Sequence, residues 1–240
     1  MLSSRIMQET SLGLVKKTII PSRDLTALEV LGYIRSNNDA VFIDSLDPSS
    51  SHVPAFNSIA TRNLEIRKQL SGYISGTSKY IYLSTSNLYS SSTYLVDETS
   101  KTASCPSGSY LHLKYQSEQI LRPLVECLSI CRIPALWSNP PKSNGSSFFD
   151  DLIVSRINNI KLSSREGDES VLSYLNLDQA SNSLSRLAFR QLPSLFNLTS
   201  LSWSTRTFLK SGIPYIETKC PGVRLSSQFK ELIIPDPILL

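Results

Sequence analysis

Short apolar runs alternate with longer segments of helical spacing, and this alternation limits the fold of the chain more than any other feature. We expect strands at 15–20, 39–43, 79–83, 128–133 and 171–177. Helices are expected at 25–34, 54–70, 110–128, 148–160 and 178–190. Strand 79–83 is almost continuously apolar, which is typical of a parallel strand covered on both faces. The pattern predicts an α/β, doubly wound fold with a mostly parallel sheet.

Single residues refine several of these elements. Asp24 is expected to cap helix 25–34, and Asp178 to cap helix 178–190. Pro123 is expected to bend or break the segment at 110–128, since proline interrupts a helix. Helix 54–70 is expected to bury an apolar face made of Phe56, Ile59, Leu64 and Ile66.

The composition narrows the classes of function. Of the 240 residues, 40% are hydrophobic and 18% are charged, and the formal net charge is +4. Lysines and arginines are scattered rather than clustered, so no nucleic-acid surface is expected. No apolar run approaches the roughly 20 residues that span a bilayer, and the first residues lack the pattern of a secretory signal. We expect a cytoplasmic protein whose four cysteines are buried thiols.

Two segments carry the residues best suited to chemistry. The strand at 79–83 runs into a hydroxyl-rich turn, and Tyr110 and Lys114 follow four positions apart in a helical pattern. Positions i and i+4 lie on one face of a helix, so the Lys114 ammonium can stabilise the phenolate of Tyr110. Such a phenol can exchange a proton with a carbonyl group during hydride transfer. The alternative is an exposed helical pair that arises by chance. His52 and His112 have no companions that would suggest a metal site.

The order of these segments resembles the extended short-chain dehydrogenase/reductase superfamily, the branch of nucleotide-sugar epimerases, dehydratases and reductases. Its active Ser or Thr falls on Thr85, its Tyr-x-x-x-Lys on Tyr110 and Lys114, and a following Glu on Glu118. Further landmarks match at 56–64, 130–137 and 174–178, in the correct order. The resemblance implies a Rossmann-like domain at 1–195 and a small substrate lobe at 196–240.

The resemblance also implies roles for individual residues. Tyr110 would be the acid or base, Thr85 would orient the substrate oxygen, and Lys114 would hold the nicotinamide ribose. Arg23 follows strand 15–20, where an arginine can pair with the 2′-phosphate of NADP. The cofactor would be NAD or NADP, the substrate a nucleotide-linked sugar, and the assembly a homodimer. The expected substrate-binding residues are Ser84, Ser86 and Asn87.

The chain departs from the family pattern where the dinucleotide phosphates should bind. It has no Gly-x-x-Gly-x-x-Gly motif, because Gly13 is its only glycine before Gly32. We therefore expect the first strand and its loop to be missing. Asp44 and Asp47 stand where the family places small apolar residues, and two carboxylates there would repel a pyrophosphate.

Three hypotheses remain open on these grounds. The chain is an epimerase or reductase, a non-catalytic relative that no longer binds the dinucleotide, or part of a heteromer that supplies the missing strand. Dehydratase activity is disfavoured, because Ser86 and Asn87 replace the acidic pair of the family's dehydratases.

Overall fold

The structure is a computed structural model, and it describes residues 25–37, 40–48, 55–74, 78–89, 97–124, 128–137, 171–188, 190–198 and 202–204. The chain separates into two compact units. One comprises Met1–Ile133 with Gln179–Leu198, and the other Pro134–Asp178 with Thr199–Leu240. The predicted strand at 15–20 and helix at 148–160 lie outside the described residues, as does most of the proposed lobe at 196–240.

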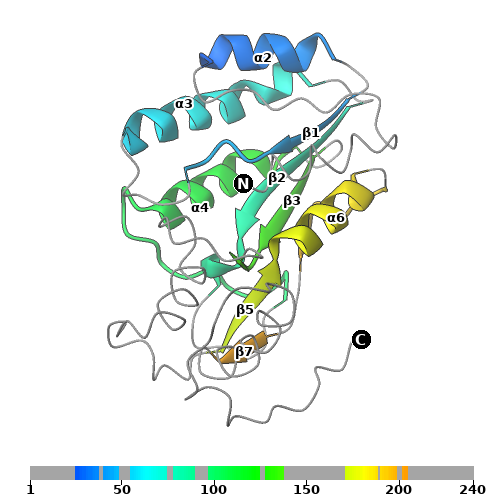
Figure 1. Ribbon diagram of the computed structural model, residues 1–240. Coiled ribbons are helices and arrows are strands. Elements are labelled where there is room, and N and C mark those ends of the chain that lie inside the picture. The colour runs from blue at the N-terminus through cyan, green and yellow to red at the C-terminus, as the bar shows by residue number, and fades with distance from the viewer. Residues whose placement is uncertain are drawn as a thin grey trace, which may run out of the picture. The chain divides into compact units, whose positions relative to one another are not determined.

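The first unit is built on a parallel four-stranded sheet with the strand order β1-β2-β3-β6. Its strands are β1 (Val41–Asp44), β2 (Lys79–Thr85), β3 (Leu128–Ile133) and β6 (Leu195–Asn197). The helices are α2 (Ala27–Arg35), α3 (Phe56–Gln69), α4 (Tyr110–Leu121) and α6 (Leu177–Leu187). Figure 1 shows α2, α3 and α4 on one side of this sheet and α6 on the other. The predicted α/β class with a parallel sheet is confirmed.

The caps and ends of several helices differ from the prediction. Helix α2 is capped by Thr26 rather than Asp24, in a capping box with Glu29. Asp178 lies inside the first turn of α6 instead of capping it. Helix α4 ends at Leu121, two residues before Pro123, because proline has no N–H to continue the helical hydrogen bonds. The short 3-10 helices η1 (Leu70–Gly72) and η2 (Ser86–Leu88) follow α3 and β2.

The second unit contains a separate three-stranded sheet with the order β4-β5-β7. Strands β4 (Ala135–Trp137) and β5 (Val171–Asn176) are parallel, and β7 (Ser202–Ser204) is antiparallel to β5. Only β5 is among the predicted strands. Across all described residues, no helix is long and apolar enough to cross a membrane.

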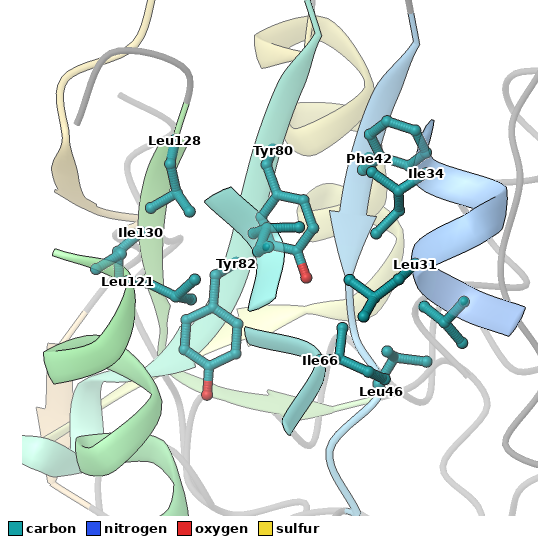
Figure 2. Packing of buried hydrophobic residues seen from close by; sticks show 12 residues of the cluster. Leu31, Ile34, Phe42, Leu46, Ile66, Tyr80, Tyr82, Leu121, Leu128 and Ile130 are labelled. Carbon is teal, nitrogen blue, oxygen red and sulfur yellow. The ribbon is translucent and has the colours of Figure 1, made fainter. Parts of the chain in front are cut away.

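An apolar cluster fills the space between α2, α3, α4 and the sheet (Figure 2). Alternate strand residues face it, because side chains along a strand point to opposite sides in turn. The helices contribute Leu31, Ile34, Ile66 and Leu121, and the strands contribute Phe42, Tyr80, Tyr82, Leu128 and Ile130. The buried face of α3 differs from the prediction. It comprises Phe56, Asn63, Ile66 and Arg67, so half of it is polar.

Candidate active site

The carboxyl end of β2 supplies the first candidate residue. Thr85 is the last residue of the strand and is buried, and its Oγ1 accepts a hydrogen bond of 3.2 Å from the Asn87 N–H. This contact caps η2. Ser86 is half-buried and Asn87 is exposed. Ser84 points into the interior and donates to Glu118 at 2.6 Å, so its hydroxyl already has a protein partner.

The beginning of α4 supplies the other two candidate residues. Ser109 caps the helix by accepting a hydrogen bond from the His112 N–H. Tyr110 is therefore the first helical residue, and Lys114 lies one turn later. The Lys114 Nζ is 5.6 Å from the centre of the Tyr110 ring. The structure thus brings the predicted pair together. Because Lys114 is only 5% exposed and Tyr110 is half-buried, the pair is not an exposed one.

Lys114 is held by two groups from the sheet and its loop. Its Nζ donates to the Leu83 carbonyl oxygen at 2.6 Å. It also forms an ion pair with Asp47 Oδ2 at 3.0 Å. The ammonium lies 5.0 Å from the centre of the Tyr82 ring. Lysine carries three N–H donors, so these two partners, taken among the described residues, leave one donor for a further group.

Asp47 is fixed by four side chains. Its Oδ1 accepts from Arg67 at 2.9 Å and from Asn63 at 3.1 Å. Its Oδ2 accepts from the Tyr82 hydroxyl at 2.8 Å and from Lys114. All of these groups are buried. The carboxylate is fully hydrogen-bonded without any ligand, which is what a buried charge requires.

Asp44, the last residue of β1, is bound in the same manner on the other side of Arg67. The guanidinium donates to both of its oxygens, at 2.9 and 3.1 Å. The Tyr80 hydroxyl donates at 2.7 Å and the Leu46 N–H at 3.0 Å. We therefore name Asp44, Asp47, Arg67 and Lys114 the charge cluster. Its two carboxylates and two cations balance, so the expected pair of free carboxylates is corrected to a pair that the protein itself neutralises.

The protonation of the charge cluster follows from burial and pairing. Burial alone would raise the pKa of Asp47, but the attraction of Arg67 and Lys114 outweighs it and holds that pKa well below its usual range. Burial would lower the pKa of Lys114, and Asp47 and Tyr110 reverse this to a net rise. Burial, followed by the neighbouring Asp47, raises the pKa of Tyr82 well above its ordinary value. Asp47 and Lys114 thus keep their charges near neutral pH.

A second ion pair lies beside the candidate site. Glu118 accepts from Arg132 at 2.9 and 2.6 Å, and the guanidinium lies 4.5 Å from the centre of the Tyr89 ring. One terminal nitrogen of Arg132 has no hydrogen-bond partner. Arg132 is a buried partner of Glu118 and is only 1% exposed. The side chain of Trp137 and all of Arg23 lie outside the described residues.

Comparison with known proteins supports the fold. No family model and no curated protein matches the sequence. Three solved structures cover most of the chain. A UDP-glucose 4-epimerase from Thermotoga maritima, solved with UDP-glucose, is 15% identical with a TM-score of 0.64, over 89% of this chain and 78% of that one. A Thermus thermophilus UDP-glucose 4-epimerase in complex with NAD is 14% identical with a TM-score of 0.62, over 94% of this chain and 83% of that one. RMD from Pseudomonas aeruginosa, solved with NADPH, is 12% identical with a TM-score of 0.63, over 94% of this chain and 80% of that one. The chain has the Rossmann-like fold of these structures.

The sequence analysis did not identify the residues that hold the charge cluster together. Arg67, Asn63, Tyr80 and Tyr82 were interpreted only as parts of a helix and a strand. A signal for them exists. Two aspartates directly after a buried strand need a cation, and Asn63 and Arg67 are four positions apart on the helix that follows. Tyr80 and Tyr82 alternate on one face of β2, so both hydroxyls point to the same side.

Proposed function

We propose that this chain is an NAD(P)-dependent epimerase or reductase that acts on a nucleotide-linked sugar. The observation that carries the proposal is the pairing of Tyr110 with the buried ammonium of Lys114, 5.6 Å from the ring centre, in an epimerase-like fold. A phenol beside a fixed cation suits proton exchange with a carbonyl or hydroxyl group. The homodimer, the lobe at 196–240 and the role of Arg23 are parts of the same proposal.

Each residue of the site has its own role in the proposed reaction. Tyr110 gives a proton to the substrate oxygen in one direction and takes it back in the other. Lys114 keeps positive charge beside the phenolate that forms when the proton leaves. Thr85 orients the same oxygen from the end of β2, and Ser86 and Asn87 on η2 bind the sugar. Ser84, next to Thr85 in β2, is fixed by its hydrogen bond to Glu118.

The dinucleotide would supply the hydride acceptor or donor. The described residues fit its ribose, because the third N–H of Lys114 remains for a hydroxyl group. The charge cluster is electrically balanced, so Asp47 and Asp44 are not free to repel an anion. Arg23 would favour NADPH by pairing with the 2′-phosphate.

A calorimetric titration of the full chain with NADH and NADPH tests the proposal. Micromolar binding is expected, followed by turnover in a screen of nucleotide sugars such as UDP-glucose. Tyr110→Phe should then reduce turnover at least about a hundredfold, as loss of a general acid does. The matched control is Tyr115→Phe, a half-buried tyrosine on the same helix, which should keep turnover near the wild-type rate. Equal turnover in Tyr110→Phe and wild type would contradict the assignment.

A second candidate function is a non-catalytic relative that binds a partner and no dinucleotide. The charge cluster is compatible with it, because every oxygen of both carboxylates already accepts hydrogen bonds from within the protein and the cluster can serve stability alone. The missing glycine motif favours it. A folded chain that binds neither NADH nor NADPH would decide for this candidate.

A further inference from the structure

The cation of the candidate site has an unusual environment for a lysine. Lys114 is buried, and its amine sits between α4, β2 and the loop that follows β1. Burial of a lysine favours the neutral amine, since the charged form loses its hydration. A neutral amine would have nothing with which to stabilise a phenolate. Something in the protein must therefore keep this lysine charged.

The charged and titratable groups that face Lys114 come from four elements. The loop after β1 brings Asp47, at 3.0 Å, and α3 brings Arg67, a like charge that opposes the ammonium. Strand β2 contributes the Tyr82 ring at 5.0 Å, and α4 contributes the Tyr110 ring at 5.6 Å. Among these, Asp47 is the group that carries a full negative charge. The attraction that offsets burial and Arg67 comes chiefly from this carboxylate.

We propose that Asp47 is the positioning residue that keeps Lys114 charged and fixes its ammonium beside Tyr110. Asp47 holds the amine from one side while the Leu83 carbonyl holds it from another, which leaves the remaining N–H direction for Tyr110 or a ligand. Asp47 is itself immobilised by Arg67, Asn63 and Tyr82. The position of the ammonium is therefore set by the loop after β1 as well as by its own helix.

Asp44 offers a matched control within the same cluster. It binds the same guanidinium as Asp47 and is similarly buried. Its described polar contacts are with Arg67, Tyr80 and the Leu46 N–H, whereas the ion pair with Lys114 belongs to Asp47. Asp44→Asn and Asp47→Asn thus both remove one buried negative charge from Arg67, but only Asp47→Asn removes it from Lys114.

The test follows the Lys114 ammonium directly, by NMR of the full chain labelled with ¹⁵N-lysine. The variant Lys114→Met assigns the signal by its disappearance. In the wild type the ammonium should persist above the ordinary lysine value of 10.5. In Asp47→Asn its titration midpoint should fall by at least about one pH unit, a tenfold loss of proton affinity. In Asp44→Asn the midpoint should stay close to that of the wild type.

Equal shifts in the two aspartate variants, or none in Asp47→Asn, would overturn the proposal. If Asp47→Asn does not fold, the wild type decides alone, since a Lys114 ammonium that titrates below 10.5 would also overturn it.

The consequence for ligand binding rests on the proposed function. NADH affinity of the wild type should be constant up to the lysine value of 10.5, because Lys114 keeps its charge and its donors. In Asp47→Asn the affinity should decline at lower pH, together with the ammonium signal. If no folded variant binds NADH, the proposed function fails, while the NMR result still decides whether Asp47 controls Lys114.

Discussion

The layer between the sheet and helices α3 and α4 has two ends of opposite character. Along each strand the residues that face this layer change from apolar to polar toward the carboxyl end. Phe42 gives way to Asp44 in β1, Tyr80 and Tyr82 lead to Ser84 in β2, and Leu128 and Ile130 lead to Arg132 in β3. Figure 2 shows the apolar end, where Leu31, Ile34, Leu121 and Leu128 surround the two tyrosines.

The two ends are stabilised by different physics. The apolar end gains from the removal of hydrocarbon from water and from close packing, which depend on volume and not on pH. The charged end depends on pairing, because a buried ion is tolerated only while its partner is present. This difference predicts that single substitutions at the charged end have larger and pH-dependent effects. The candidate site lies at that end, where the parallel strands finish.

Arg67→Met should have the largest effect on stability. It keeps the apolar stem but leaves Asp44 and Asp47 without their shared cation, so we expect a loss of about 3–5 kcal/mol in the free energy of unfolding. Urea unfolding followed by circular dichroism measures it. Lys68→Met on the exposed side of the same helix is the control and should be within about 0.5 kcal/mol of wild type. A small loss in Arg67→Met would mean that the carboxylates find other donors.

Leu31→Ala probes the apolar end. This side chain is fully buried in the cluster, so its truncation leaves a cavity and should lower the free energy of unfolding by about 3 kcal/mol. The loss should be the same at acid and neutral pH, because no titrating group is involved. A loss that changes with pH would show that the two ends of the layer are coupled.

The sequence predicts the apolar end better than the charged end, and the reason is physical. Apolar periodicity reports burial directly, so strand 79–83 and helix 54–70 were predicted near their observed positions. Charged residues are normally exposed, so Arg67 carries no local sign that it is buried. Its partners Asp44, Asp47 and Ser117 lie 23, 20 and 50 positions away, and only the fold brings them together.

Part of the candidate site could be predicted from the sequence. The spacing of Tyr110 and Lys114 is local, and a helix places them on one face whatever the rest of the chain does. The partner of Lys114 could not be predicted in this way. Asp47 reaches it from the loop after β1, and the sequence alone led us to expect that this carboxylate would repel a ligand. In the structure its charge is used within the protein.

The loss of stability in acid should also distinguish the charged end from the apolar end. The pKa of Asp47 is lower in the folded chain than in the unfolded chain, so its contribution to stability is present above the ordinary value of 3.8 and is lost as the pH falls below it. We expect the wild type to lose ~2 kcal/mol more than Asp47→Asn between neutral pH and that acid range. Urea unfolding at a series of pH values measures the difference. Parallel curves for the two proteins would contradict the ion pairing of Asp47.

Tyr82→Phe should have the smallest effect and tests how the two ends meet. Tyr82 belongs to both, because its ring packs in the apolar cluster while its hydroxyl donates to Asp47 at 2.8 Å. Phenylalanine keeps the ring contacts with Arg67 and Lys114 and removes the hydroxyl that donates to Asp47. A bond to a buried carboxylate contributes about 1.5 kcal/mol, and that is the expected loss. The loss should be clearly smaller in the Asp47→Asn background if the hydroxyl acts through the charge of Asp47, and an equal loss there would show that the hydroxyl acts through another group.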